Sequence, residues 1–453
     1  MKLFKIKISS IFLLILAFGL LLRIIIMFWS FNFRENTDAL RWKDWGRITY
    51  LHSLSDTYKP TYLTFGTLPN NMPPGTLYTV AGMYNLNIQI SKVALKLTGT
   101  KEGNMLWINQ YLPNLLFRFP SIISDIIIAF LIYYIVKEKK SDKIAIFSSS
   151  LFLFNPIVIY NSAFSGQMDA LNNVFAFISI FLLYKNRVFP SILFFFLSLF
   201  IKLSLIFYIP IYLMLFLQKK SLKKITICTI LSFAFIMLLT LPLSNNPIGW
   251  FIDFMKNNSL GEMRNITVFA FNFWWMIMHP IMTLGDQATL FSFSEIRLHN
   301  SPSDSTIYFG ISLFKWAIAI FGIFLIPILA CIHKLKQKAF NMDHLLLFFA
   351  LTAMIAFLFL PRMHDRYLYP AFPLLAAYIG LQNKHLIPFI ILSILHFLNY
   401  YFVWHPFATP LIPYSFISNP TVQWSISFLT VLTIIVIYTT SIRQHELFSK
   451  KKV

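Results

Sequence analysis

Long apolar runs recur along this chain and constrain its fold more than any other feature. Hydrophobic residues make up 57% of the sequence and charged residues 12%, compared with about 45–50% and about 25% in an ordinary soluble domain. A soluble core could not bury 50 Phe residues together with the other apolar side chains. Lipid is therefore the expected solvent for most of the chain. This excludes a disordered chain, a coiled coil and a disulfide scaffold.

The apolar runs predict about twelve transmembrane helices, since a helix of about 20 residues crosses the hydrocarbon core. We expect an all-α polytopic membrane protein with amphipathic helices in its outer loops. The first run has no A-x-A-like cleavage site after it, so we interpret it as an uncleaved span. The expected spans are residues 8–31, 114–136, 144–160, 169–184, 188–201, 203–217, 225–242, 309–332, 342–360, 368–382, 386–402 and 424–441.

Basic residues lie mainly in short loops between the apolar runs. Lys and Arg total 38 against 17 Asp and Glu, a formal charge of +21. Because cytoplasmic loops carry an excess of Lys and Arg, both termini are predicted to be cytoplasmic. The expected partner of this charge is anionic membrane lipid, not nucleic acid. The basic loops are residues 137–143, 185–187, 219–224 and 333–338, and the tail 450–452.

The long connections lie on the opposite, outer face. Loops longer than about 15 residues are uncommon unless they are functional or disordered, and these are too aromatic to be disordered. Chemistry is therefore expected on this face. We predict a transmembrane catalytic domain over residues 1–405, including outer loops 32–113 and 243–308. Residues 406–453 would form a C-terminal outer loop, a last span and a basic cytoplasmic tail.

Two acidic residues in the first outer loop, Asp38 and Asp44, are candidates for a general base. A helical stretch over 37–53 would place Trp42 and Trp45 on the face of Asp38, where they could hold its carboxylate at the bilayer boundary. The alternative for both acids is a solvated, charged helix end.

Further polar residues on the outer side are candidates for substrate contacts. Asn71 opens an Asn-Met-Pro-Pro-Gly run typical of a rigid turn into a helix. Arg118 and Asp125 share one face of a predicted span, so they line a polar cavity or form a structural ion pair. Gln167 and Asp169 lie just above the membrane, where sugar hydroxyls could bind. The alternative for Asp169 is a helix N-cap.

Lys202 divides an apolar run over 188–217 that has basic loops at both ends. The run must therefore go out and return, in two arms of about 14 residues, or roughly 21 Å of helix each. That is short of a hydrocarbon core of about 30 Å. Lys202 would then lie at membrane depth on the outer side, where its ammonium needs an anion. A lipid phosphate fits, and pairing with Asp125 or Asp169 is the alternative.

Three basic residues, Arg362, His364 and Arg366, follow the ninth predicted span. Together they could form a cationic fork for a phosphate, and a solvated loop is the alternative. No P-loop, dinucleotide fingerprint or zinc spacing occurs, so a nucleotide bound to a soluble Rossmann domain is not the expected donor. The two cysteines, Cys228 and Cys331, lie in apolar segments and predict neither a disulfide nor a metal site.

In this order, the motifs resemble those of membrane glycosyltransferases of the GT-C fold. The resemblance is in particular to bacterial mannosyltransferase-like members and to dolichyl-phosphate-sugar enzymes, and it covers about residues 10–405. The matching positions are Asp38 with Trp45, 71–75, 118–120 with Asp125, 155–156 with Ser162, 166–169, 201–202, 270–274 and 362–367.

The resemblance implies transfer of a hexose such as mannose from a polyprenyl-phosphate donor, with inversion. The acceptor would be a lipid-linked or cell-surface glycan on the extracytoplasmic face. Asp38 would be the catalytic base, with Asp44 in reserve, and no metal or other cofactor would be needed. The Lys, Ile, Asn and Phe content favours a bacterial source, and hence the inner (cell) membrane. The resemblance assigns the donor phosphate to Lys202, Arg362, His364 and Arg366, and other substrate contacts to Asn71, Arg118, Asp125, Gln167, Asp169, Asn272 and Trp274.

Two other functions share parts of this pattern. A lipid-linked glycan polymerase or ligase would share the substrates, the sidedness and the number of spans. A lipid-sugar transporter would share the spans, but transporters tend to have internal repeats and a midplane site. In this sequence the polar motifs gather near one face, and no repeat is visible.

Overall fold

The computed structural model describes residues 7–30, 37–64, 67–99, 111–219, 221–259, 263–284, 301–406 and 410–447. Within these residues the chain is mostly helical, with four strands of two residues each. The predicted all-α class is therefore found, with the short strands as an addition. The terminal residues 1–6 and 448–453, which contain the predicted basic tail, lie outside the described residues.

Seven helices in the described residues are long and apolar enough to cross a membrane. An eighth span results if α5 (Asp142–Leu153) and the helix that follows it from Pro156 count as one, bent by 51°. The seven are α1 (Ser10–Ser30), α4 (Leu112–Lys137), α10 (Leu222–Thr240), α13 (Leu313–Leu335), α14 (Met342–Phe359), α16 (Leu386–Trp404) and α18 (Pro420–Leu447).

The other four predicted spans are also helical, but each is only 10–17 residues long. They are α7 (Asp169–Tyr184), α8 (Val188–Ile201), the 3-10 helix η6 (Leu203–Tyr208) continuing into α9 (Ile209–Leu217), and α15 (Ala371–Gln382). Each predicted apolar segment therefore forms a helix, and the count of twelve crossings stays a prediction.

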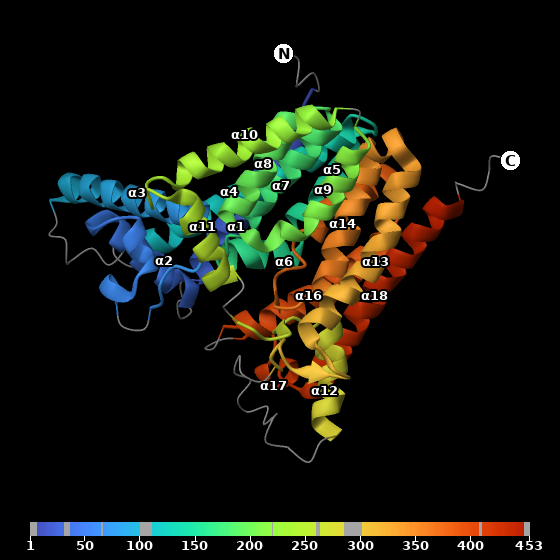
Figure 1. Ribbon diagram of the computed structural model, residues 1–453. Helices are drawn as coiled ribbons and strands as arrows, with labels where there is room; N and C mark the ends of the chain where they lie inside the picture. The colour runs from blue at the N-terminus through green and yellow to red at the C-terminus, as the bar shows by residue number, and fades with distance from the viewer. Residues whose placement is uncertain are drawn as a thin grey trace.

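Helix α14 lies at the centre of the bundle. Its sides contact α7, α13, α15 and α18 (Figure 1). In the most apolar stretch of α14, 89% is buried inside the protein, compared with 28% in α1 and 22% in α10. A helix that is apolar all round is stable where it is covered all round, so α14 forms the core while α1 and α10 present apolar faces outward.

The chain folds back at Lys202 as expected. The rings of Phe195 on α8 and Tyr212 on α9 lie 4.4 Å apart between centroids, so the two arms pack against each other. Lys202 has extended backbone angles, φ −154° and ψ 128°, which interrupt the helix between them. The side chain of Lys202 is buried at this break.

The first outer segment consists of α2 (Thr37–Leu51) and α3 (Pro74–Thr98), which pack side by side, with 3-10 turns η1 (Ser55–Tyr58) and η2 (Pro60–Tyr62) between them (Figure 1). The helical stretch predicted over 37–53 is therefore found, as α2. The start of α3 rests on the end of α8, because Thr76 Oγ1 donates to the carbonyl of Ile201 at 2.6 Å. A Cβ on Gly75 would lie 2.7 Å from the Phe200 carbonyl oxygen, so only glycine allows this approach.

The second outer segment packs on the loop that carries the predicted basic residues. Strand β1 (Thr267–Val268) pairs in parallel with β4 (Met363–His364), and β2 (Ile307–Tyr308) pairs with β3 (Ile311–Ser312). These strand pairs satisfy backbone N–H and C=O groups in the loops between the helices. The same segment contains α11 (Pro247–Phe254), the π-helical turn η7 (Met255–Ser259) and α12 (Phe273–Leu284).

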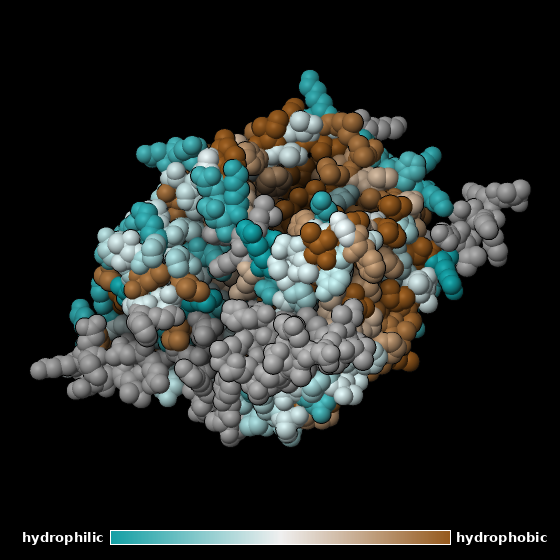
Figure 2. Space-filling model, turned by 60° about the horizontal axis from the view of Figure 1, so that its bottom comes forward, coloured by the Kyte–Doolittle hydropathy of each residue, from teal (hydrophilic) through white to brown (hydrophobic). Residues whose placement is uncertain are grey.

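The remaining short elements are α6 (Pro156–Ile159), η5 (Tyr160–Phe164), η10 (Lys336–Phe340) and α17 (Tyr414–Ile417). On the face of Figure 2, polar side chains gather at the left, over the region of α2 and α3, whereas hydrophobic ones spread across the upper part. The polar outer segments and the apolar bundle are therefore distinct surfaces of one molecule.

Candidate functional site

Three buried charges, Asp169, Lys202 and Arg366, form an ionic cluster that we call the buried cluster. Lys202 Nζ pairs with Asp169 Oδ1, and Arg366 Nε lies 3.4 Å from Asp169 Oδ2. The side chains of all three are at most 8% exposed. Asn161 Nδ2 also donates to Asp169 Oδ2, at 3.3 Å. The predicted alternative for Lys202, a pair with Asp169, is thus confirmed.

The buried cluster exists because three helix and strand ends meet. Asp169 is the first residue of α7, where a carboxylate is favoured by the helix dipole. Lys202 occupies the break between α8 and η6, and Arg366 follows β4 by two residues. Each of the three charged residues lies at the end of a helix or strand. Their side chains can therefore converge on one point between these ends.

Asp38 lies at the edge of the buried cluster. Its Oδ2 accepts a hydrogen bond from Gln167 Nε2 at 2.8 Å, and its Oδ1 lies 3.5 Å from Arg41 Nη1. The Asp38 side chain is 18% exposed, so it can be reached from outside. Asp38 also interacts electrostatically with Lys202 and with Arg366. The structure therefore brings together Asp38, Gln167, Asp169, Lys202 and Arg366, all of which are site residues predicted from sequence.

Arg118 shapes the loop that carries Gln167. Its Nη2 donates to the Phe164 carbonyl at 3.1 Å, and its side chain packs on Gly166, which has a φ of +71°. A Cβ at Gly166 would lie 2.7 Å from Arg118 Cγ, so glycine is required there. Ser121 Oγ donates to the Gln167 carbonyl at 2.7 Å. These contacts give Arg118 a positioning role beneath Gln167.

Of the two alternatives for Arg118 and Asp125, a polar cavity or an ion pair with each other, the ion pair is wrong, because Asp125 has another partner. Asp125 pairs with Arg23 of α1 at 3.0 Å, and both side chains are fully buried. Ser162 Oγ donates to Asp125 Oδ2 at 2.6 Å, and the Tyr369 hydroxyl donates to Oδ1. These contacts leave Asp125 enclosed by protein groups, in a structural role. Sequence reasoning missed Arg23, although a lone charge in an apolar span was a signal for a buried partner.

Asp44 is held inside the first outer segment. Its Oδ1 accepts from Arg47 at 2.8 Å, and its Oδ2 accepts from the Thr64 amide at 2.9 Å and from Thr67 Oγ1 at 2.6 Å. Burial acts to raise the pKa of Asp44, but the hydrogen bonds from Thr67, Thr64 and Arg47 outweigh it and lower the pKa below the ordinary value. Both oxygens are engaged in holding the loop, so Asp38 is the better placed of the two candidate bases.

The predicted phosphate residues divide into two places. The ring of His364 is tilted by 53° against that of Tyr367, with centroids 4.9 Å apart, and His364 interacts electrostatically with Arg366 and Lys202. Lys202 Nζ lies 5.1 Å from the centroid of the Tyr367 ring. Arg362 instead binds Asp304, with Nη2 2.7 Å from Oδ2. Three of the four predicted residues therefore lie around the buried cluster, and Arg362 is engaged with the second outer segment.

Asn272 and Trp274, predicted to contact substrate, have hydrogen bonds to the end of α14 and to each other. Asn272 Nδ2 donates to the Phe357 carbonyl at 2.9 Å, and Asn272 Oδ1 accepts from the Trp274 amide at 3.1 Å. Trp274 Nε1 donates to the Phe359 carbonyl at 2.8 Å. Both side chains are buried. Their polar atoms dock the start of α12 on the end of α14.

Two further residues lie beside the cluster: Asp365, which belongs to the 362–367 motif, and Trp404, which has no signal for this role in the sequence. Trp404, the last residue of α16, donates from Nε1 to Asp365 Oδ2 at 2.8 Å. Asp365 Oδ1 lies 3.5 Å from Arg366 Nη1, and Arg366 lies over the Trp404 ring, 5.9 Å from its centroid. An acid and an aromatic ring thus flank the guanidinium.

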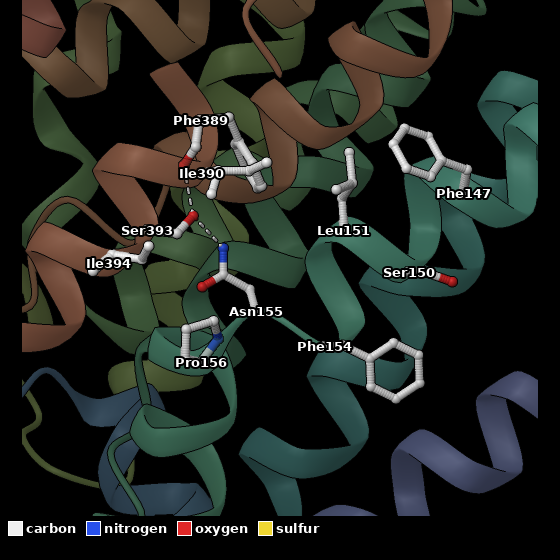
Figure 3. Close-up of a pocket in the computed structure, with 10 residues that line it drawn as sticks. All are labelled: Phe147, Ser150, Leu151, Phe154, Asn155, Pro156, Phe389, Ile390, Ser393 and Ile394. Carbon is white, nitrogen blue, oxygen red and sulfur yellow. Dashed lines mark hydrogen bonds between the residues drawn. The ribbon is translucent and has the colours of Figure 1, made fainter. Parts of the chain in front are cut away.

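The Asn155-Pro156 motif lies in a separate apolar pocket of about 290 Å³, between α5–α6 and α16 (Figure 3). Asn155 Nδ2 donates to Ser393 Oγ at 2.8 Å, and Asn155 Oδ1 accepts from the Ile157 amide and so caps α6. The described residues that line this pocket include no acid and no base. Asn155 is therefore a structural residue of the bend, apart from the buried cluster.

Asn71 lies in another pocket, of about 390 Å³, which opens between the first and second outer segments. Within the part of the chain that is described, no three His, Cys, Asp or Glu side chains are grouped as they would be around a metal ion. No protein-family model matches this chain, and no curated protein matches it.

Proposed function

We propose that this chain is a membrane glycosyltransferase that moves a hexose from a polyprenyl-phosphate donor to a glycan acceptor. The observation that carries the proposal is a reachable carboxylate, Asp38, beside two buried cations, Lys202 and Arg366, at the outer edge of an apolar bundle. The carboxylate suits an acceptor hydroxyl, the two cations suit a sugar phosphate, and the apolar bundle suits a lipid chain.

The cations have donors to spare for a phosphate. Arg366 has five N–H groups, yet it lies 3.4 Å from Asp169 and 3.5 Å from Asp365. Both distances exceed the roughly 2.7–2.9 Å of a charge-assisted hydrogen bond. Lys202 uses Asp169 as its carboxylate partner and has three donors. The phosphodiester of the donor would be held between them, and the polyprenyl phosphate monoester that leaves would be stabilised by both charges.

Asp38 supplies the second half of the chemistry. In the proposed step, the acceptor hydroxyl gives its proton to Asp38 while its oxygen forms a bond to the anomeric carbon. The bond from that carbon to the phosphate oxygen breaks, and the electron pair leaves with the polyprenyl phosphate. Attack from the side opposite the phosphate inverts the anomeric configuration. The hydrogen bond from Gln167 keeps one carboxylate oxygen fixed during the transfer.

The proposal is tested with the purified full chain in lipid nanodiscs. The donor is a radiolabelled polyprenyl-phosphate hexose, with mannose first, and the acceptor is a lipid extract from cells that lack this chain. We expect label to enter a new glycan, and Asp38→Asn to lower the rate by roughly 10²–10⁴ while donor binding persists. Asp44→Asn is the matched control, and it should retain transfer.

Three results would contradict the proposal. They are movement of the labelled donor across the bilayer without transfer, no use of any labelled donor, and normal transfer by Asp38→Asn. The first would instead identify a lipid-sugar transporter.

A further inference from the structure

The pocket around Asn71 is built from the first outer segment and the second, and we call it the outer-loop pocket. Its volume of about 390 Å³ lies in the range of ordinary ligand sites. Aromatic rings and small polar groups line it together, among them Tyr58, Asn70, Asn71, Trp250, Asp253 and Asn257.

The aromatic wall is rigid. The rings of Trp250 and Tyr58 meet edge to face with centroids 5.1 Å apart, and Phe254 stacks on Trp250 at 5.3 Å and 10°. The Tyr58 hydroxyl donates to the Met72 carbonyl at 3.0 Å, which fixes the ring. Such a wall offers apolar contact area at little cost in conformational entropy.

Another lining residue, Asn70, is a buried amide whose nitrogen lacks a partner among the described residues. Asn70 is 2% exposed, and its Oδ1 accepts from the Met72 amide at 2.8 Å. Among the described residues, nothing accepts a hydrogen bond from Asn70 Nδ2. An unmade hydrogen bond at a buried group costs about 1–3 kcal/mol. A ligand oxygen in the pocket would remove that cost.

The rim completes the set of polar groups. Asp253 and Asn257 are exposed and four residues apart across the junction of α11 and η7, so they lie on one helical face. Asn71 faces the pocket from the first outer segment. The described lining contains no Lys or Arg. A neutral polyhydroxyl compound therefore suits the pocket better than a phosphate or another anion.

We infer that the outer-loop pocket binds a neutral saccharide, with sugar C–H groups on the aromatic wall and hydroxyls on the amides and on Asp253. Its role as a distal binding site for the acceptor glycan rests on the proposed function. The two sites are joined by one apolar cluster, which contains Trp42 and Trp45 of α2 together with Met168, the neighbour of Gln167. Tyr58 and Trp250 pack on the same cluster. A bound glycan would thus be anchored on the segment that carries Asp38.

Binding is tested with the full chain in nanodiscs on an array of neutral hexose oligosaccharides. The variant is Asp253→Ala/Asn257→Ala, whose two side chains are exposed, so folding should not be affected. We expect about tenfold weaker glycan binding, which corresponds to one or two lost hydrogen bonds. Asp38→Asn should bind glycan like the unmodified chain. The matched control is Asp56→Ala, a half-buried acid of the nearby η1 turn whose side chain is 20% exposed.

Equal glycan binding by the double variant and the unmodified chain would overturn the inference, as would absence of glycan binding by the unmodified chain. Binding of peptides in place of glycans would also overturn it. In the transfer assay, the double variant should raise the acceptor KM with little change in kcat. Pocket-dependent glycan binding by a chain that transfers no sugar would refute the proposed function and still support the pocket.

Discussion

Gln167 donates a hydrogen bond from Nε2 to Asp38 Oδ2 at 2.8 Å, across 129 positions of sequence. The loop that carries Gln167 is itself held by Ser121 and by the close packing of Arg118 on Gly166. The orientation of the Asp38 carboxylate is therefore set by the loop before α7 as much as by α2. We therefore expect the activity of Asp38, the proposed base, to depend on Gln167, which does not itself take the proton.

Replacing Gln167 with Ala should lower the rate of transfer about tenfold, because one hydrogen bond to a charged group contributes about 1.5–3 kcal/mol at most and part of it is regained from water. The melting temperature should change little, since the Gln167 carbonyl that Ser121 binds remains. Transfer kinetics and thermal unfolding of the same preparation check both statements. An unchanged rate would show that Asp38 needs no positioning.

Replacing Lys202 with Met should destabilise the fold by about 3–5 kcal/mol, because the buried carboxylate of Asp169 loses its closest cation. Asp169→Asn/Lys202→Met should recover most of that stability, since no unpaired acid remains. The double variant should still bind the labelled donor about 10–100-fold more weakly, from the loss of one charged contact to phosphate. Thermal unfolding and donor binding separate the two effects, and normal donor binding by the double variant would make Lys202 purely structural.

Replacing Gly75 with Ala should lower stability by about 1–3 kcal/mol. The added Cβ would lie 2.7 Å from the carbonyl oxygen of Phe200, a backbone atom that cannot turn aside. Gly82→Ala in the same helix is the matched control, because nothing lies within 4 Å of its Cβ. That change should stabilise the helix by about 0.5–1 kcal/mol. Melting temperatures that fall for both variants would argue against the close approach of α3 to α8.

Asp44 should make stability depend on pH in the acid range. Its folded-state pKa lies below the ordinary value of 3.8, because hydrogen bonds from Thr67, Thr64 and Arg47 outweigh burial. The stabilisation is therefore complete above the unfolded-state value and is lost as the pH falls through the lower folded-state value. Asp44→Asn should be less stable than the unmodified chain at about pH 7 and pH 5, and the gap should narrow near about pH 3. Thermal unfolding at these three values checks this, and a gap that does not change with pH would contradict it.

Much of the helical structure could be predicted, because it depends on local pattern. Each of the twelve apolar segments is a helix, and Pro74 begins α3 where the Pro-Pro-Gly run predicted a start. The fold-back at Lys202 could be predicted as well, since loop charge and the length of each arm are read directly from the chain. The two-residue strands β1 and β4 could not, because 94 intervening residues separate them and two residues carry no periodicity.

The candidate site divides in the same way. Asp38, Gln167, Asp169, Lys202 and Arg366 could be named from their residue types and their places at the ends of apolar runs. Their partners could not be named, except that Asp169 was one of the two acids considered for Lys202. Arg362, Asn272 and Trp274 show the difference, because their polar atoms bind Asp304 and the end of α14. A polar residue in an outer loop has the same local sequence whether it faces a ligand or another segment.

By itself, the sequence determined which segments are apolar enough for a membrane, that these segments are helical, and where along the chain charged residues interrupt them. These follow from hydrophobicity and periodicity, which act over a few residues. Only the tertiary structure decided that Asp125 pairs with Arg23, that Asp169 joins Lys202 to Arg366, and that Asp38 lies beside them. A buried charge must find an opposite charge wherever packing places one, and packing joins segments that are far apart in the chain.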